Sequence, residues 1–423
     1  MSDVLLTGVH VAAALAVVLV VGCAGRSAAR LLRQPETVGE IVAGLLAGPA
    51  AVALLGRSTF DAVLPGDVLD IMKLVAEAGL VLFLVGLAHK LRLGAHRSSL
   101  WTSVWLVAGG LVPAMLAGVL FAGWILLADE PGVRGSAPLP AFLLMCAVAL
   151  SITGVPVLAW ILAERNATET LEGRLSMTAA VVIDTAGWLL LSVAVGLSTG
   201  ELNGFVQSVV VLGGGAAAAL GVRGALRTRA AHNLCEQRPL ITAVLLGAIA
   251  LTMALTVEHL GLTAIFGAVL VGLALPPDGP WQQVANRVTS LGRGMIPFFF
   301  VVTGVTVFAG GIGPLPWALT AGAILLAVLG KGVGSYFGAR MAGQPKQTAV
   351  TVGVLMNTRG LTELIVLKVG YNADILTRPV FVALIVMAVA TTVMTGPLLL
   401  LTKWSPGQPV RASVGSKSQD DSP

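Results

Sequence analysis

Residues 145–191 read MCAVALSITGVPVLAWILAERNATETLEGRLSMTAAVVIDTAGWLLL, which is two apolar segments joined by a short charged turn. The first segment is interrupted by Ser151-Ile152-Thr153-Gly154 and by Pro156. A break of this kind inside a membrane is tolerated only where the freed backbone carbonyls line protein or water. The second segment carries one carboxylate, Asp184, which costs about 2.5–3.5 kcal/mol near the centre of a bilayer. Together they predict a site for a small cation, with hard oxygen ligands and one titratable acid. The plainer interpretation is a Pro/Gly kink beside a buried, hydrogen-bonded aspartate.

The composition of the whole chain is that of a membrane protein. Of its 423 residues, 56% are hydrophobic and 11% are charged, and the mean hydropathy is +0.91. A soluble protein carries about 25% charged residues. The net charge of +5 comes from Lys and Arg residues in the predicted loops, where it bears on orientation in the membrane. We therefore expect no nucleic-acid partner. No catalytic triad, phosphate-binding loop or metal cluster is found, so we expect no enzyme activity, no catalytic residue and no cofactor. The three cysteines, which lie in or beside apolar segments, predict neither disulfides nor thiol chemistry: Cys23, Cys146 and Cys235.

Apolar runs of about 20 residues, separated by Gly, Pro and charge, predict an all-α polytopic protein with about thirteen transmembrane helices. Residues 1–403 are predicted to form one membrane domain, and residues 404–423 a short, disordered cytoplasmic tail. The predicted spans lie near residues 4–22, 36–55, 68–88, 101–127, 139–163, 173–198, 205–222, 239–256, 259–275, 293–310, 315–338, 348–368 and 379–402.

The loop charges predict how the chain is oriented. Most Lys and Arg residues of the loops follow odd-numbered spans. The positive-inside rule therefore places the N-terminus outside and the C-terminus in the cytoplasm. A wrong number of spans would disturb this alternation, so it supports thirteen. We expect a multi-pass protein of the cell membrane, surrounded by lipid. The loop residues that follow even-numbered spans are few: Arg57, Arg134, Lys368 and Arg378.

A second interruption, Asn357-Thr358-Arg359-Gly360, breaks the span at 348–368 much as the first breaks the span at 139–163. The two are the fifth and the twelfth span, an offset of seven, and an odd offset means that they run in opposite directions. Spans four to six and eleven to thirteen are therefore predicted to be inverted repeats, with two broken helices that cross at the midplane. Arg359 and Glu363 are four residues apart and share one helix face if the helix continues through them.

Several motifs occur in an order that resembles one family. They include AGLVLFLVGL (78–87), the break ALSITGVPV (149–157) with the carboxylate segment AAVVIDTAGW (179–188), and LGKGVGSYFGAR (329–340). LMNTRGLTELIVL (355–367) is the most specific of them. The set resembles the monovalent cation:proton antiporters of the sodium/hydrogen exchanger fold, second branch, over nearly the whole chain.

This resemblance implies an exchange of Na⁺ or K⁺ for H⁺ by a homodimer. A core domain of helices 4–6 and 11–13 would move in an elevator-type motion against dimerisation helices 1–3 and 8–10. The essential aspartate of the family carries over onto Asp184, where a cation and a proton would compete for one acid. Its conserved basic residue carries over onto Lys331. Two residues match the unwound-helix positions near the ion, namely Ser151 and Thr153, and the supporting residues of the second broken helix are Asn357, Arg359 and Glu363. The last two either offset the dipoles of the broken helices or form a structural salt bridge.

One position departs from the family pattern. Many members carry an acidic or amide residue directly before the aspartate, whereas this chain has Ile183. Lys331 then needs another partner, lies near a backbone dipole, or stays neutral. One titratable carboxylate predicts one proton per cation, and hence electroneutral exchange. Two other functions stay open: a membrane sensor or regulator that does not transport, favoured by Ile183, and a sodium-coupled transporter of an organic solute.

Overall fold

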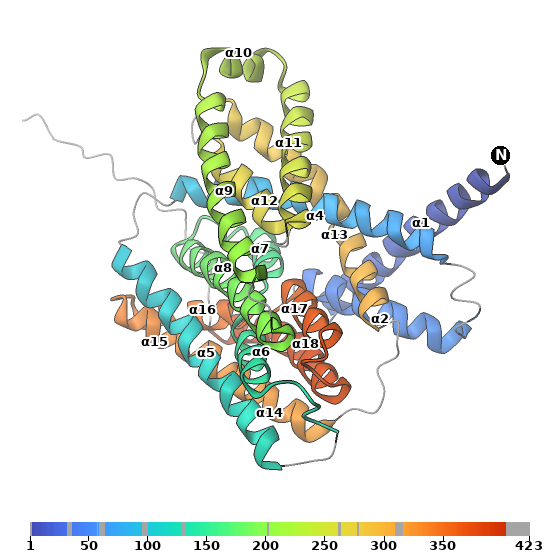
Figure 1. Ribbon diagram of the computed structural model, residues 1–423. Coiled ribbons are helices and arrows are strands. Elements are labelled where there is room, and N and C mark those ends of the chain that lie inside the picture. Colours follow the sequence, from blue (N-terminus) through green and yellow to red (C-terminus); the bar gives the residue numbers. More distant parts are fainter. Residues whose placement is uncertain are drawn as a thin grey trace, which may run out of the picture.

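The computed structural model describes residues 2–31, 36–56, 58, 64–94, 100–128, 132–200, 203–260, 264–276, 279–308 and 316–402. Within these residues the regular structure is entirely helical (Figure 1). The predicted tail at 404–423 lies outside the described residues. In chain order the helices are α1 (Ser2–Leu31), α2 (Glu36–Leu55), α4 (Gly66–Gly94), α5 (Leu100–Ala128), α6 (Leu139–Ser151), α7 (Val155–Glu164), α8 (Leu171–Thr199), α9 (Asn203–Leu226), α10 (Arg229–Gln237), α11 (Pro239–His259), α12 (Ala264–Ala274), α13 (Trp281–Phe308), α14 (Trp317–Ala327), the π-helix η2 (Val328–Val333), α15 (Gly334–Met341), α16 (Lys346–Met356), α17 (Leu361–Asn372) and α18 (Arg378–Leu401).

These helices overlap every range in which a transmembrane span is predicted. In the described part of the chain, 8 helical segments are both long and apolar enough to cross a membrane, including Leu139–Glu164 and Trp317–Met341. Some of them bury little of their apolar surface within the protein, as expected where lipid is the neighbour: only 6% of the Val209–Leu226 segment is buried. The all-α polytopic fold is confirmed, and the number of thirteen spans stays a prediction.

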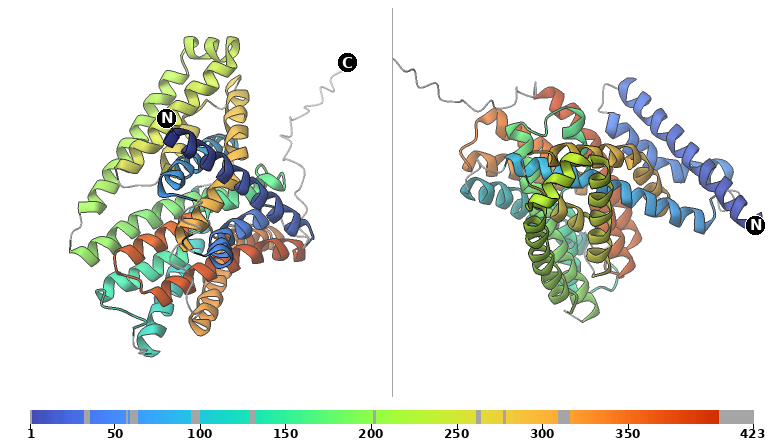
Figure 2. Two further views of the ribbon diagram at one scale, coloured as in Figure 1. Left: turned by 90° about the vertical axis from the view of Figure 1, so that its right-hand side faces the viewer. Right: turned by 90° about the horizontal axis from the view of Figure 1, so that it is seen from above.

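The helices pack in two groups. In the first group, α4 packs against α12 and α13, α2 lies between α1 and α13, and α11 contacts α12. In the second group, α5 packs against α6, α8, η2 and α15, and α18 packs against α14, α16 and α17. Figure 2 (right) shows α1 and α2 on one side of the molecule, and α5 and α15 on the other. The groups correspond to spans 1–3 with 8–10 and to spans 4–6 with 11–13, whose roles as dimerisation and core domains stay predictions.

A stripe of glycines brings η2 and α15 into backbone contact with α5. A Cβ at Gly334 would lie 2.5 Å from the carbonyl oxygen of Gly109, and a Cβ at Gly338 would lie 2.9 Å from the Cα of Gly109. Gly330, four residues before Gly334, has the same close approach, because a Cβ there would lie 2.7 Å from the Cβ of Ala117. Small residues at this spacing allow membrane helices to approach closely. The contact fixes the π-helical turn of η2 against the second group of helices.

Both predicted breaks are present, and they cross. The first separates α6 from α7 and the second separates α16 from α17. The backbone N–H of Gly154 donates to the carbonyl of Thr358 at 3.2 Å. A Cβ at Gly154 would lie 2.6 Å from the backbone carbon of Arg359 and from the nitrogen of Gly360, so a larger residue does not fit. The prediction of two crossed broken helices is confirmed.

Candidate ion-binding site

Asp184 lies in the middle of α8 and is 2% exposed. The helix begins at an N-cap, Thr170, whose hydroxyl oxygen accepts from the N–H of Gly173 at 3.1 Å. The oxygen Oδ1 of Asp184 is buried without a hydrogen-bond partner among the described residues. The side chains of Lys331, Thr362 and Trp188 lie near this carboxylate. Asp184 is therefore a buried carboxylate that retains capacity to accept a proton or a cation.

The first break supplies two hydroxyl groups, and they differ in availability. The hydroxyl of Ser151 donates to the carbonyl of Val148, 3.1 Å away, within its own helix. The hydroxyl oxygen of Thr153 is buried and has no hydrogen-bond partner within the described chain. The carbonyl of Thr153 accepts from the N–H of Val155 at 2.8 Å and from the hydroxyl of Thr362 at 3.5 Å. Of the two predicted hydroxyl ligands, Thr153 is the one with an unused hydroxyl.

Two basic side chains cover the end of α6. The side-chain nitrogen Nζ of Lys331 donates to the carbonyl of Ser151. Arg359 donates from one guanidinium nitrogen to the carbonyl of Ala149 at 2.8 Å and from the other to that of Leu150 at 2.6 Å. The last carbonyls of a helix lack partners within it and form the negative end of its dipole. Of the alternatives left open for Lys331, the structure shows a backbone dipole as its partner.

Arg359 also forms an ion pair with Glu363. The pair joins a guanidinium nitrogen to a carboxylate oxygen at 3.0 Å, and both side chains are 0% exposed. The pair forms although the helix is interrupted between the two residues, since α17 begins only after Gly360. The carbonyl of Arg359 accepts from the hydroxyl of Thr392 on α18 at 2.7 Å. Arg359 therefore takes part both in the salt bridge and in covering the dipole of α6.

Asn357 occupies a different environment. Neither polar atom of its side-chain amide makes a hydrogen bond within the described part of the chain, although the residue is 2% exposed. The side chain lines a cavity of about 250 Å³, formed by η2 and helices α15, α16 and α18. Gly332 and Tyr336 also line this cavity. A direct role of Asn357 beside Asp184 stays a prediction.

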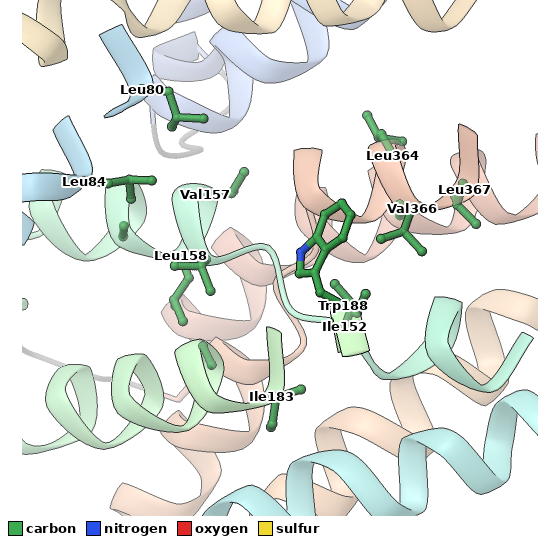
Figure 3. Close-up of a cluster of buried hydrophobic side chains, with 14 of the residues drawn as sticks. Leu80, Leu84, Ile152, Val157, Leu158, Ile183, Trp188, Leu364, Val366 and Leu367 are labelled. Carbon is green, nitrogen blue, oxygen red and sulfur yellow. The ribbon is translucent and has the colours of Figure 1, made fainter. Parts of the chain in front are cut away.

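Apolar side chains enclose the crossover. Ile183 is fully buried, and its Cδ1 would lie 2.8 Å from a Cβ at Gly110 of α5. The hydroxyl of Ser335 approaches the same point. Ile183, the residue directly before Asp184, thus packs against α5. Figure 3 shows the surrounding cluster, to which α4, the first break, α7, α8 and α17 contribute Leu80, Leu84, Ile152, Val157, Leu158, Ile183, Trp188, Leu364, Val366 and Leu367.

Sequence reasoning missed several polar residues of this region. Thr362 and Trp188 lie near the carboxylate of Asp184, although its Oδ1 has no hydrogen-bond partner in the described part of the chain. On α18, Thr392 binds the second break, and Thr395 shares a hydrogen bond with Thr358 at 3.3 Å between the two hydroxyl oxygens. The available signal was the run ATTVMTG (390–396), in which threonines recur within one apolar span. Such residues are also common as packing residues between membrane helices, so the signal is weak by itself.

Comparison with known proteins decides the family. Residues 15–401 match the family model described as "Sodium/hydrogen exchanger, transmembrane". The chain belongs to this family. This family member is 34% identical over 380 residues to Cation/H(+) antiporter 19 of Arabidopsis thaliana, covering 88% of the chain and 46% of the plant protein. The chain thus spans about half the length of that relative.

This exchanger-family chain also has relatives of similar length. It is 30% identical over 385 residues to Na(+)/H(+) antiporter NhaS4 of Synechocystis sp., covering 87% of the chain and 91% of the relative. Its fold is similar to the structure of the sodium proton antiporter MjNhaP1 from Methanocaldococcus jannaschii. The TM-score is 0.63 at 16% identity, covering 95% of this chain and 100% of that one. The predicted resemblance is confirmed, and the protein is a multi-pass membrane protein.

Proposed function

We propose that the protein is a secondary active antiporter that exchanges a monovalent cation, Na⁺ or K⁺, for H⁺, with Asp184 as its single site of competition. Membership of the exchanger family supports this, as do the relatives named as cation or sodium antiporters. The observation that carries the proposal is the unpartnered, buried oxygen of Asp184 at the crossing of two broken helices. Near this carboxylate, the hydroxyl of Thr362 donates to the carbonyl of Thr153 at 3.5 Å, and the hydroxyl of Thr153 is also unpartnered in the described residues.

The mechanism follows from the cost of burying a charge. The ionised carboxylate of Asp184 attracts a cation that has lost part of its water, and a proton displaces that cation by neutralising the acid. Binding of the cation or of the proton makes the site neutral. The empty site is charged, and the free-energy cost of desolvating that charge keeps it on one side of the membrane. Lys331 and Arg359 stabilise the broken end of α6 while a proton replaces the cation at Asp184. One acid gives one proton per cation, so the exchange is electroneutral.

The placement in the membrane is part of the proposal. The loop charges favour a cell-membrane protein with its N-terminus outside and its C-terminus in the cytoplasm. The group of α1, α2, α4, α11, α12 and α13 would form the contact of a homodimer. The group that holds both breaks would move against it.

The proposal is tested in everted membrane vesicles from cells that lack their own antiporters. A pH-sensitive dye reports the proton gradient while Na⁺, K⁺ or Li⁺ is added between pH 6 and 9. We expect one or more cations to collapse the gradient with the wild type and not with Asp184→Asn at equal protein level. Asp374→Asn is the matched control, because this exposed residue has a φ of 54°, which asparagine also adopts.

If no cation collapses the gradient although the wild-type protein is present in the membrane, the antiport proposal is rejected. Ile183, which stands where many family members have an acidic or amide residue, then favours a sensor or regulator on the same fold. A sodium-dependent uptake of an organic solute that is lost in Asp184→Asn would favour the third function instead.

A further inference from the structure

The oxygen groups near Asp184 are too few for a cation if only the predicted ligands are counted. The carbonyls of Ala149, Leu150 and Ser151 are occupied by Arg359 and Lys331. Hard cations of this kind take about six oxygen ligands, some of them from water. The carboxylate and the hydroxyl of Thr153 therefore leave part of the coordination shell unfilled.

Thr362 offers a further oxygen beside the first break. It lies in the first turn of α17, directly after the second break, and is 0% exposed. Its hydroxyl lies 3.5 Å from the carbonyl oxygen of Thr153, and the nearby carboxylate of Asp184 is a second possible acceptor. A threonine hydroxyl has one proton to donate and two lone pairs to offer. It can therefore serve only one of these two acceptors at a time.

We propose that Thr362 is a ligand of the transported cation and contributes an oxygen from the second broken helix. The inference rests on the proposed antiport function and adds to it a ligand and a determinant of cation selectivity. When a cation is bound, the O–H of Thr362 donates to the carbonyl of Thr153, and its lone pairs are free for the ion. When the site is empty, rotation of the hydroxyl lets the same O–H donate to Asp184.

The physical argument is the cost of unsatisfied oxygen atoms. The hydroxyl of Thr153 and the Oδ1 of Asp184 are both buried without partners, and such groups are expensive to leave unpaired. A cation between these atoms and Thr362 satisfies all three at once. Because α8, the first break and α17 each supply one ligand, binding of the ion joins both broken helices.

The experiment compares Thr362→Val, which has nearly the same shape without a hydroxyl, with Thr362→Ser, which keeps the hydroxyl. Thr391→Val is the matched control, because Thr391 is also 0% exposed and its hydroxyl donates within its own helix to the carbonyl of Met387 at 2.9 Å. Vesicle assays give the apparent KM and the maximal rate for Li⁺, Na⁺ and K⁺. Purified protein gives the increase of the thermal midpoint that each cation causes.

We expect Thr362→Val to raise the apparent KM about tenfold or more, which corresponds to the loss of one contact to a charged group. The preference among the three cations should change as well, a result that loss of a purely structural hydroxyl does not produce. Thr362→Ser and Thr391→Val should stay close to the wild type. If Thr362→Val does not fold, Thr362→Cys is used instead, since a thiol is a poor ligand for a hard cation.

The outcomes separate the two proposals. If the wild type exchanges cations and the KM and selectivity of Thr362→Val are unchanged, or change only as much as those of Thr391→Val, the ligand role of Thr362 is rejected while antiport stands. If the wild type shows neither exchange nor stabilisation by any of the three cations, both proposals are rejected. If the purified wild type is stabilised by a cation without exchanging it, the loss of that stabilisation in Thr362→Val supports the ligand role alone, and its retention rejects it.

Discussion

The side-chain nitrogen Nζ of Lys331 donates a hydrogen bond to the carbonyl of Ser151, which is 180 residues away in the chain. Lys331 lies on the π-helical segment η2, and Ser151 is the last residue of α6. π-Helical turns inside α-helices occur frequently at functional sites. The bond supplies a donor to a carbonyl that has no partner in its own helix, so the wider turn of η2 and the broken end of α6 stabilise each other.

Replacement of Lys331 tests this bond. Lys331→Met leaves the carbonyl of Ser151 buried without its donor, which we expect to cost about 1–3 kcal/mol of stability. Lys331→Gln keeps an N–H donor and should cost less. The thermal midpoint of the purified protein in detergent measures the difference. Equal midpoints for the two variants would show that the hydrogen bond does not stabilise the fold.

The ion pair of Arg359 and Glu363 gives a second prediction. Arg359→Met leaves the carboxylate of Glu363 buried without its partner, and breaking a buried pair in this way costs about 3–5 kcal/mol. The double variant Arg359→Met/Glu363→Met removes both charges and should recover part of that loss. Thermal midpoints of the single and double variants form the test. A double variant that is no more stable than Arg359→Met would mean that the bonds of Arg359 to the carbonyls of α6 dominate.

The close crossing of the backbones gives a third prediction. Gly154→Ala introduces a Cβ 2.6 Å from backbone atoms of Arg359 and Gly360, so one broken helix has to move. We expect strongly reduced folding yield, or folded protein without exchange activity. Gly213→Ala on α9 is the control, because a Cβ there meets nothing within 4 Å. Detergent-solubilised, monodisperse protein is measured by gel filtration, and wild-type behaviour of Gly154→Ala would contradict the crossing.

The charge balance of exchange gives a fourth prediction. If Asp184 is the one acid that carries the proton, each cycle moves one cation against one proton and no net charge. The initial rate in sealed proteoliposomes should then be the same when the membrane potential is set to zero or to an inside-negative value with an ionophore. A rate that follows the membrane potential would require a second proton carrier, for which the buried Glu363 next to the second break is a candidate.

Much of the architecture could be predicted because, in a membrane protein, breaks and buried charges are visible in short segments of the sequence. An interruption such as Ser151–Gly154 contrasts with the apolar residues around it, and so does the single carboxylate of Asp184. The offset of seven from the fifth span to the twelfth is odd, so the two broken helices are predicted to run in opposite directions. The cost of polar groups in lipid makes each such residue conspicuous without knowledge of its neighbours.

Hydrogen bonds between residues that are far apart in the chain could not be predicted in the same way. The sequence left open whether Ser151 and Thr153 both have free hydroxyls, and the structure shows that the Ser151 hydroxyl is used by its own helix. Many family members have an acidic or amide residue where this chain has Ile183. The sequence therefore left open whether Lys331 has another partner, lies near a backbone dipole or stays neutral. A hydrogen bond depends on a few tenths of an ångström and on direction, neither of which spacing along the chain determines.

The sequence by itself determined that this protein spans a membrane, that two of its helices are broken, and that one aspartate is buried among apolar residues. Hydropathy, backbone breaks and charge in lipid are properties of short segments, so they can be recognised from the chain alone. Only the tertiary structure decided that Lys331 and Arg359 cover the end of α6, and that the hydroxyl of Thr362 reaches the carbonyl of Thr153. These contacts join residues from about 180 to 210 positions apart, and they exist only because two broken helices cross with their backbones touching at Gly154.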